Sequence, residues 1–413
     1  MDRFKWDLGQ ELPGDRDLLQ TGRGLEGRRV ALCMSGGIAA YRAPDVVRAL
    51  RREGAEVLVY ATPEALRFVS REALEWCSLN PVIDRLDGKA QHVEDSREVD
   101  LYLLAPATYS TLNKVAWGFA DNGVTTTLAS AIGRLEAGTT QVMVVPTMHG
   151  SMVNSILRES LARLEERGVV VVPPRPGAGK ANLPDVAELV ARCVRCLGEK
   201  ESPLAGRSVL VTAGPTPTPV DDVRLLTNRF TGATGLAIAE ALWRRGAEVE
   251  LVLGGQAVSP PPWISVTRAK DFSAYQSAVL ASEAEIGVFS AAVADYRPTE
   301  TVSGKIPSGG ELSQLNLVPT PKIIDAVAAE KPHMCMVSFK LETGISYGAL
   351  MEIARARLDA GSSLVVANRM EDGGAATLVD RRGEREVAAR ADLPEALVAW
   401  LESHYRSDGD HSP

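Results

Sequence analysis

Two stretches decide the fold of this chain: GGIAAYRAPDVVRALRREGAEVLVY at residues 36–60 and TGATGLAIAEALWRRGAEVELVL at residues 231–253. Each begins with a glycine turn and continues through a helical pattern that ends in basic residues and Gly. Each closes on an apolar strand introduced by Ala-Glu-Val. A strand, a helix and a second strand in this order form a βαβ unit, which builds a parallel sheet. Because the pattern occurs twice and nothing recurs at short period, we predict two domains rather than a repeat protein.

Apolar strands alternate with amphipathic helices on both sides of these stretches. The strands predicted in the first half are Val30–Met34, Ala55–Ala61, Leu101–Ala105 and Val142–Pro146. Those predicted in the second half are Ser208–Ala213, Ala247–Leu253, Ile286–Ser290, Met336–Phe339 and Leu364–Ala367. Such alternation is typical of parallel sheets covered on both faces. We therefore predict an α/β protein with two doubly wound, Rossmann-like domains.

The domain boundaries follow from length and composition. A chain of 413 residues is too long for one ordinary core. The polar stretch LGEKESPLAG at 197–206 is the best linker candidate. We predict a first domain at 27–198, a linker at 199–206 and a second domain at 207–405. Residues 1–26 and 406–413 are expected to be loosely ordered.

Composition excludes several classes of protein. A net charge of −8 argues against a general nucleic-acid binder, which needs a basic face. No stretch is long and apolar enough to span a membrane, and the acidic N-terminus is no signal peptide, so we expect a cytoplasmic protein. Five cysteines do not form a disulfide framework. Cys193 and Cys196 form a CxxC pattern inside a predicted helix, without the second ligand pair that a zinc site needs.

Three features of the first half lie where a sheet edge could bind a ligand. Ser35, Gly36 and Gly37 form a turn between the first strand and its helix, where glycines and free N–H groups suit an anion. Ala105-Pro106-Ala107-Thr108 follows a buried strand directly. His92 is a candidate base near the same edge. The turn lacks the GxGxxG spacing of a nicotinamide-dinucleotide site.

These motifs resemble a known family. SGGIAAYR, the His of HVE, LLAPAT and the later PTM resemble, in order and spacing, the flavin-binding half of the bifunctional phosphopantothenoylcysteine decarboxylase/phosphopantothenate–cysteine ligase of coenzyme A synthesis. In the second half, VTAGPTPTPVDDVR, FSAAVADYRP, the PKII and VSFKLET segments and Val366-Ala367-Asn368 resemble its ligase domain. The resemblance extends from about Gly27 to Tyr405.

The resemblance implies an N-terminal, flavodoxin-like flavoprotein domain that binds FMN and decarboxylates phosphopantothenoylcysteine. It implies His92 as the catalytic histidine and Met148 and His149 as contacts of the decarboxylase substrate. The residues that it places around FMN are Ser35, Gly36, Gly37, Thr62, Ala105, Pro106, Ala107 and Thr108.

For the second half the resemblance implies ligation of 4′-phosphopantothenate to cysteine through an acyl-cytidylate made from CTP, with Mg²⁺ on the phosphates. Lys305 is expected to neutralise phosphate charge, Asn228 to contact the acyl-phosphate intermediate and Phe339 to flank the nucleotide. The residues implied to bind CTP or phosphopantothenate are Gly214, Thr231, Gly232, Ala291, Asp295, Lys305, Pro321, Lys322, Ile323, Ile324, Phe339 and Arg357.

The sequence departs from the family pattern in both halves. The family's PxMN is Pro146-Thr147-Met148-His149 here, so a histidine replaces the asparagine expected to bind the substrate carboxylate. The family's flap cysteine has no counterpart in PPRPGAGKANLP at 173–184. The SSGKMG turn of the ligase is FTGATG at 230–235, without its lysine, and a pair of lysines is represented by Arg357 alone.

Two alternatives stay open beside the bifunctional enzyme. The first is a ligase whose flavin-binding domain no longer decarboxylates and serves as a scaffold. The second is a non-catalytic nucleotide-binding protein with two relic sites, against which the retained Asp295 and Lys305 argue. The resemblance further implies small-molecule substrates and a homo-oligomer.

Overall fold

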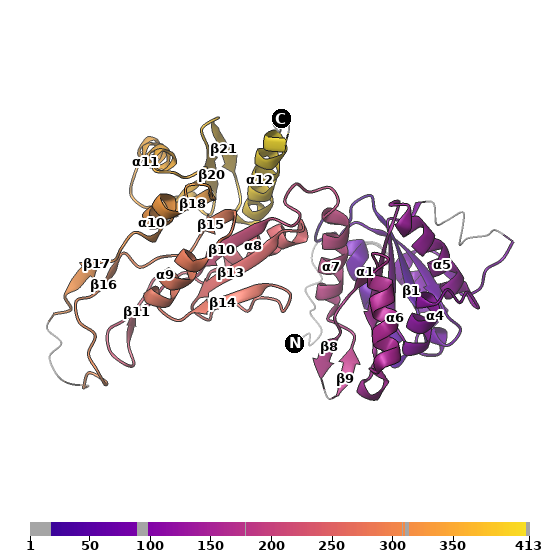
Figure 1. The fold of residues 1–413 in the computed structure, drawn as a ribbon. Helices are drawn as coiled ribbons and strands as arrows, with labels where there is room; N and C mark the ends of the chain where they lie inside the picture. Colours follow the sequence, from indigo (N-terminus) through magenta and orange to yellow (C-terminus); the bar gives the residue numbers. More distant parts are fainter. Residues whose placement is uncertain (1–17, 89–97, 178, 308, 310–313, 410–413) are drawn as a thin grey trace, which may run out of the picture. The chain divides into compact units, whose positions relative to one another are not determined.

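The computed structural model of this chain describes residues 18–88, 98–177, 179–307, 309 and 314–409. The chain forms two compact units, Met1–Leu197 and Gly198–Pro413 (Figure 1). Within the described residues no helix has both the length and the apolar character to cross a membrane. The two units are described separately.

The first unit is built on a six-stranded parallel sheet. Its strands, from one edge to the other, are β3 (Val82–Ile83), β2 (Glu56–Ala61), β1 (Arg29–Met34), β4 (Leu101–Ala107), β5 (Gln141–Pro146) and β7 (Val170–Val171). The prediction of a Rossmann-like domain is confirmed. The order 3-2-1-4-5 is that of a Rossmann sheet, whereas a flavodoxin-like sheet runs 2-1-3-4-5. The order reverses between β1 and β4, which is where such folds bind ligands.

Helices cover both faces of this sheet (Figure 1). The helices on one face are α1 (Ala43–Arg52), α2 (Arg71–Ser78) and α7 (Val186–Gly198), and those on the other are α4 (Tyr109–Ala116), α5 (Gly123–Glu136) and α6 (Ser155–Glu165). Along β1, Val30 and Leu32 join the first core, and Ala31 and Cys33 join the second. Burial of both faces explains why these strands are almost continuously apolar.

The second unit contains an eight-stranded sheet. Its order is β14 (Ser265–Ala269), β13 (Glu248–Gly254), β10 (Ser208–Ala213), β15 (Ile286–Phe289), β18 (Cys335–Glu342), β19 (Leu364–Arg369), β20 (Ala376–Val379) and β21 (Glu384–Val387). The first six strands are parallel, and β20 and β21 extend the sheet in antiparallel fashion. Numbered within the sheet, the parallel strands again follow 3-2-1-4-5-6, with the reversal between β10 and β15.

The helices of the second unit also form two layers. On one face lie α9 (Phe272–Ala281), α10 (Ile323–Glu330) and α11 (Tyr347–Asp359). On the other face α8 (Ala233–Arg244) packs beside α12 (Leu393–Gly409). This three-layer arrangement is the second Rossmann-like domain that the alternating pattern predicts.

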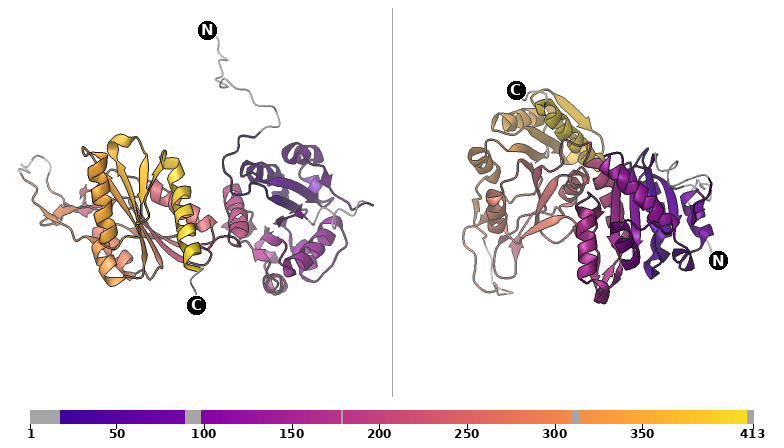
Figure 2. Two further views of the ribbon diagram at one scale, coloured as in Figure 1. Left: turned by 90° about the horizontal axis from the view of Figure 1, so that it is seen from above. Right: turned by 45° about the vertical axis from the view of Figure 1, so that its right-hand side comes forward.

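Short antiparallel ribbons and 3₁₀ turns complete the two units. The ribbons are β6 (Met148–His149) with β9 (Lys180–Asn182) and β8 (Arg175–Gly177), β11 (Thr218–Pro219) with β12 (Leu225–Leu226), and β16 (Tyr296–Pro298) with β17 (Leu317–Pro319). The 3₁₀ turns are η1 (Ile38–Arg42), η2 (Ala65–Arg67), η4 (Gly150–Met152), η5 (Met370–Asp372) and η6 (Arg390–Asp392). The ribbon of β16 and β17 extends away from the sheet of its unit (Figures 1 and 2).

The described part of the N-terminal extension differs from the expected loose order. The N–H groups of Thr21 and Gly22 donate to the carbonyl of Arg52, and Leu25 is fully buried. This segment is therefore fastened to the end of α1. The expected linker also packs on the second unit, because Leu204 is buried and the Ser202 hydroxyl donates to Glu402 at 2.8 Å. Helix α12 continues past residue 405 to Gly409.

Candidate functional site

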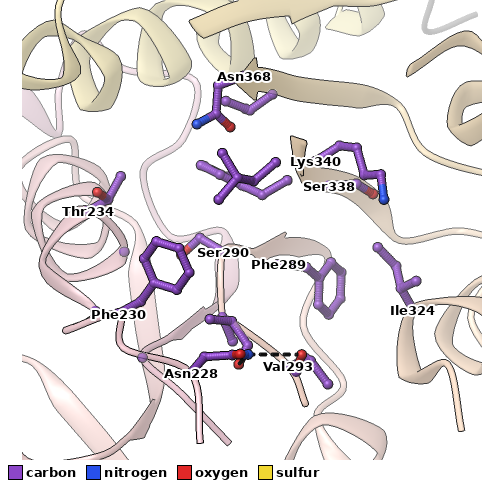
Figure 3. A pocket seen from close by; sticks show the side chains of 18 of the residues that line it. Asn228, Phe230, Thr234, Phe289, Ser290, Val293, Ile324, Ser338, Lys340 and Asn368 are labelled. Carbon is purple, nitrogen blue, oxygen red and sulfur yellow. Dashed lines mark hydrogen bonds between the residues drawn. The ribbon is translucent and has the colours of Figure 1, made fainter. Parts of the chain in front are cut away.

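A cavity of about 500 Å³ lies at the carboxyl edge of the second sheet, where the strand order reverses. It is lined by residues that follow or end β10, β15, β18 and β19 and by the first turns of α8 and α10. Figure 3 shows side chains from α8, α10, β15, β18 and β19 around it, with Asn228 at one end and Asn368 at the other. This is the position at which doubly wound folds bind ligands.

Two loops that carry the most specific sequence motifs meet at this edge. The Ala292 N–H donates to the Gly214 carbonyl at 2.9 Å, and the Ala294 N–H donates to the Thr216 hydroxyl at 2.8 Å. The carbonyl of Asp295 in turn accepts from the Thr320 N–H at 2.9 Å. The motifs TAGPT and AAVAD therefore form one hydrogen-bonded wall, although nearly eighty residues separate them in the sequence.

Two glycines of this wall have positive φ and close backbone neighbours. A Cβ at Gly214, where φ is +78°, would lie 2.2 Å from the Gly254 carbonyl oxygen. A Cβ at Gly232, where φ is +88°, would lie 2.8 Å from the Gly214 nitrogen. Only glycine combines this backbone conformation with so close an approach. The glycines thus let the first turn of α8 pack directly on the end of β10.

The structure brings almost all of the sequence-predicted ligase residues to this cavity. The predicted residues that line it are Gly214, Asn228, Thr231, Gly232, Ala291, Asp295, Pro321, Lys322, Ile323, Ile324, Phe339 and Arg357. The Asn228 amide donates to the carbonyls of Ala292 and Val293 at 3.0 and 3.3 Å, so its orientation is fixed by the wall (Figure 3).

Lys305 is the exception, because it does not line the cavity. It lies exposed in the segment after β16, and its ammonium group has no ion pair within the described residues. The residues on either side of it are held by consecutive aspartates: Asp222 accepts from the Gly304 N–H and Asp221 from the Ile306 N–H, at 2.8 and 3.0 Å. The backbone at Lys305 is thus fastened on both sides.

Asp221 is a fully buried carboxylate with several donors. It accepts from the N–H groups of Ile306, Val223 and Arg224 and from the Arg224 guanidinium. Burial by itself would raise the pKa of Asp221, but these donors outweigh burial and hold the pKa well below the usual range of a carboxyl. The carboxylate therefore stays charged and joins the 218–226 ribbon to the segment of Lys305.

The cavity also contains residues that the sequence analysis did not select. Phe230, Phe289 and Tyr275 supply aromatic surface, and Lys340, Asn368 and Arg390 supply polar groups. Burial raises the pKa of Tyr275 to about 12, against a weaker opposite effect of its hydrogen bond to Thr212, so this phenol stays protonated. Lys340 could have been found as the neighbour of Phe339, and Asn368 in the quoted VAN motif. No motif points to Arg390.

Helix capping distinguishes the two helices whose first turns lie at the cavity from α9 and α11. Asp271 caps α9 and Ser346 caps α11, each accepting an N–H of the first turn. In contrast, the N-cap residues of α8 and α10, Gly232 and Lys322, accept no bond with their side chains, and in α8 the Ala233 N–H donates to the Thr231 hydroxyl at 3.3 Å. Free first-turn N–H groups and the positive end of the helix dipole make such helix starts favourable for phosphate.

In the first unit the predicted flavin residues also come together, at the carboxyl ends of β1, β2 and β4. The Ser35 hydroxyl donates to the Pro106 carbonyl at 2.7 Å and accepts from the Thr108 N–H at 2.9 Å. The Thr62 N–H donates to the Met34 carbonyl at 3.0 Å. Ala105 and Ala107 lie on β4 in the same segment as Pro106, and Gly36 and Gly37 follow Ser35.

The same capping contrast occurs in the first unit. Ser70, Asn122 and Asn154 cap α2, α5 and α6 with their side chains. The turns that begin at the predicted flavin edge have no such cap: η1 starts at Gly37 and α4 at Thr108, whose hydroxyl lies 3.2 Å from that of Thr111 instead. At both sheet edges there is therefore a pair of helical starts whose N-cap residues make no side-chain cap bond.

The remaining decarboxylase residues follow the neighbouring strand β5 or lie outside the described residues. His92 falls in the segment 89–97, which lies outside the described residues. Met148 and His149 form β6, which pairs Met148 with Ala181 and His149 with Lys180. The cysteine-free stretch 173–184 thus folds back beside Met148 and His149. The His149 Nδ1 atom lies 2.8 Å from the Ser151 hydroxyl.

Cys193 and Cys196 are buried in α7 and form no disulfide. Burial raises the pKa of the Cys193 thiol. Among the residues described, no group of three or more His, Cys, Asp or Glu side chains could hold a metal ion.

Comparison with known proteins matches each unit to a family. Residues 19–198 match the Flavoprotein family and residues 204–391 match the DNA/pantothenate metabolism flavoprotein C-terminal domain. The chain is 37% identical over 360 residues to the coenzyme A biosynthesis bifunctional protein CoaBC of Thermococcus kodakarensis, covering 84% of this chain and 87% of that protein. It is 34% identical over 365 residues to the protein of the same name from Mycolicibacterium smegmatis, covering 83% and 86%.

A solved structure, the C-terminal domain of a coenzyme A biosynthesis bifunctional protein CoaBC, is similar to 50% of this chain over its own full length. The two share 26% sequence identity, with a TM-score of 0.43.

Proposed function

The chain belongs to the family of coenzyme A biosynthesis bifunctional proteins, and from this premise we propose that it catalyses two consecutive reactions of that synthesis. The second unit joins 4′-phosphopantothenate to cysteine at the expense of CTP. The first unit removes CO₂ from the product and leaves 4′-phosphopantetheine. The observation that carries the proposal is the cavity at β10 and β15, which gathers the ligase residues expected from the sequence, all except Lys305.

The ligation is a two-step acyl transfer. The pantothenate carboxylate attacks the α-phosphorus of CTP and pyrophosphate leaves. The cysteine amine then attacks the acyl-cytidylate and CMP leaves. The first turns of α8 and α10, whose N-cap residues make no side-chain cap bond, would offer N–H groups to phosphate oxygens. The Asn228 amide lies at the wall where the acyl phosphate would form. Such groups act by positioning and by stabilising developing charge.

Lys305 supplies a positive charge to this chemistry in our proposal. Its ammonium group is exposed and has no ion pair within the described residues, so phosphate would not have to displace a carboxylate from it. The described residues offer no ready cage for a metal, so Mg²⁺ is expected to arrive on the CTP phosphates.

The first unit fits a phosphorylated flavin at the edge of β1 and β4. The starts of η1 and α4 would hold the phosphate of FMN, and Ser35, Pro106 and Thr108 would shape the surface along the cofactor. When bound, FMN would accept two electrons from the cysteine part of the substrate so that CO₂ can leave, and would then return them to the decarboxylated product, so that the overall reaction is redox-neutral. The protein's part is to orient the substrate, with His92 as the proposed base and Met148 and His149 as proposed substrate contacts.

A ligase with a decarboxylation-deficient flavin domain is the second candidate. His149 in place of asparagine and the cysteine-free stretch 173–184 favour it. The match of residues 19–198 to the Flavoprotein family and the bifunctional relatives favour two activities.

We also propose that the chain works as a homo-oligomer. The ribbons of the second unit expose large apolar side chains, among them Tyr296, Leu317, Leu225 and Val223. Apolar groups gathered on an extended ribbon are typical of surfaces that another chain covers. Light scattering at micromolar concentration tests this: a single species at the 44.2 kDa of one chain contradicts the proposal.

One incubation tests both activities. The purified protein is supplied with 4′-phosphopantothenate, cysteine and CTP, and the products are followed by mass spectrometry. Phosphopantothenoylcysteine with stoichiometric pyrophosphate identifies the ligase, and its conversion to 4′-phosphopantetheine with CO₂ identifies the decarboxylase. Accumulation of phosphopantothenoylcysteine by a flavin-loaded protein selects the ligase-only candidate.

Two variants assign the activities to their units. Lys305→Gln should lower ligation about 100-fold or more, the typical effect of removing one preorganised charge-stabilising group. The exposed Lys270→Gln is the matched control. His92→Asn should abolish CO₂ release while ligation continues. Unchanged ligation in Lys305→Gln contradicts the role given to that lysine.

A further inference from the structure

The cationic side chains of the ligase cavity differ in whether a carboxylate already neutralises them. Lys322 pairs with Asp295 at 2.5 Å, Arg357 pairs with Asp325 at 2.9 Å, and Lys340 pairs with Glu342 at 2.7 Å. Arg390 also lines the cavity, and across the described residues it forms no ion pair. A phosphate must compete with a carboxylate for the first three cations, and it meets no such competitor at Arg390.

Two carboxylates of the turn that leads to Gly374 are engaged elsewhere. Asp372 binds the guanidinium of Arg369 at 2.7 and 3.0 Å. Glu371 accepts from the Gly344 N–H and the Thr343 hydroxyl. Within the described residues neither of these carboxylates forms an ion pair with Arg390.

The aliphatic part of the Arg390 side chain lies across Gly374, whose positive φ is unfavourable for other residues. Gly374 has φ of +110°, and a Cβ built there would lie 3.5 Å from the Arg390 Cβ and 3.9 Å from its Nε. The bare backbone of Gly374 therefore forms the floor on which the arginine lies. Gly374 lines the cavity as well, so the guanidinium is positioned at its rim.

Sheet register locates this rim at the Asn368 end of the cavity. Strand β20 pairs with β19 so that Ala367 lies opposite Thr377, which places Ala376 opposite Asn368. Ala376 lines the cavity and follows Gly374 by two residues. The Asn368 amide points into the cavity at this end, opposite Asn228 (Figure 3). Asn368 and Arg390 thus both line the cavity, and Gly374 and Ala376 connect the floor under Arg390 to the strand position opposite Asn368.

We propose that Arg390, with Asn368, binds a phosphate group of a substrate at this end of the cavity. The proposal rests on the proposed ligase function for the identity of that substrate, which is either CTP or 4′-phosphopantothenate. A planar guanidinium binds two phosphate oxygens at once, which a lysine ammonium cannot do in the same geometry. Arg390 would thereby fix the position of the phosphorylated substrate relative to the wall at Asn228.

The test measures KM for CTP, 4′-phosphopantothenate and cysteine separately in the full-length protein. Arg390→Gln should raise KM about tenfold or more for one of the two phosphorylated substrates, as expected for loss of a charge-assisted bidentate bond, and leave KM for cysteine within twofold. The substrate affected identifies which phosphate is bound. Arg390→Lys should recover only part of the loss, because it keeps the charge and loses the fork.

Arg385→Gln is the matched control, since Arg385 is exposed on the neighbouring β21 and does not line the cavity. Values of KM for both phosphorylated substrates within twofold of the unmodified protein in Arg390→Gln would overturn the proposal. So would an equal rise for cysteine, which indicates a general disturbance of the cavity.

A binding measurement separates this proposal from the proposed function. The unmodified chain and Arg390→Gln are each titrated with pyrophosphate and with CTP in a calorimeter. This measurement needs no turnover. If Arg390→Gln binds these anions more weakly than the unmodified chain does, the phosphate site at Arg390 is supported, even when no ligation is detected. If Arg390→Gln binds pyrophosphate and CTP as tightly as the unmodified chain does, and its KM values are unchanged, the phosphate site at Arg390 is rejected. Ligation by the unmodified chain would still support the proposed function.

Discussion

The ligand edges of the two units share a backbone design and differ in side chains. Both sheets run 3-2-1-4-5, and both have, at the strand reversal, two helical starts whose N-cap residues make no side-chain cap bond. The second edge is surrounded by aromatic and charged groups that enclose a cavity of about 500 Å³. At the first edge, the Ser35 hydroxyl is hydrogen-bonded to both the Pro106 carbonyl and the Thr108 N–H. The helical starts that both edges share are suited to phosphate in general, whereas the side chains around them decide which phosphorylated molecule is bound.

The largest expected effect comes from placing a negative charge at the first edge. Gly37→Asp should weaken FMN binding about 100-fold, because the carboxylate occupies the positive helix start that the flavin phosphate needs. Flavin absorbance after dialysis against FMN measures the affinity.

Gly37→Ala is the control for that variant. A Cβ there lies 3.3 Å from the Thr108 methyl carbon, so both substitutions meet the same neighbour and only one adds charge. Equal flavin loss in both variants would mean that packing, and not the anion site, explains the result. Ligation should be unaffected in either.

The second edge can be disturbed by a single methyl group. A Cβ at Gly235 would lie 2.6 Å from that of Ala213 and 2.4 Å from the Ser290 hydroxyl oxygen. Gly235→Ala should destabilise the second unit by about 1–3 kcal/mol, a typical cost of overpacking, and slow ligation about tenfold as α8 shifts. Urea denaturation and pyrophosphate release measure the two effects.

Gly133→Ala in α5 is the matched substitution in a helix of the first unit. Nothing lies within 4 Å of the added Cβ, so it should stabilise the chain by about 0.5–1 kcal/mol. A stability loss of the same size in both variants would contradict the packing explanation for Gly235.

A smaller effect is expected at the carboxylates beside Lys305. Asp221→Asn should lower ligation severalfold, because an amide cannot accept from all the donors that surround the buried carboxylate. Since the folded pKa of Asp221 is lowered, its contribution to stability is complete above the unfolded pKa of about 4 and is lost as pH falls below it. The urea midpoint of Asp221→Asn should therefore fall less between pH 6 and pH 3 than the urea midpoint of the unmodified chain.

Asp222→Asn is the comparison for this prediction, because Asp222 is exposed and accepts only one backbone N–H of the same segment, that of Gly304. It should leave the acid dependence almost unchanged. Identical pH profiles for the unmodified chain and Asp221→Asn would refute the role of the buried carboxylate.

The smallest effect tests the capping contrast itself. Asn122 accepts from the N–H groups of Val124 and Thr125, and Asn122→Ala should lower the free energy of unfolding of the first unit by about 1 kcal/mol. Thr108→Ala should cost less, because Thr108 makes no cap bond to α4. Urea midpoints followed by tryptophan fluorescence measure both, and a larger loss at Thr108 would show that its helix start depends on that side chain.

Sequence alone determined the fold class and most of the ligase site. The period of the apolar residues and the two glycine-helix-strand stretches were sufficient to predict two doubly wound domains, because burial on both faces imposes that pattern on parallel strands. The motifs TAGPT and AAVAD were also sufficient to select residues that line the cavity, since each directly follows a strand of the sheet.

Only the tertiary structure decided how those residues are combined. It placed Lys305 away from the cavity, on a segment held by Asp221 and Asp222, and it brought Arg390 to the rim from beyond β21. Neither fact has a local signal, because exposed arginines and lysines look alike in sequence. Whether such a charge is free or neutralised depends on neighbours that are distant along the chain and adjacent only after folding.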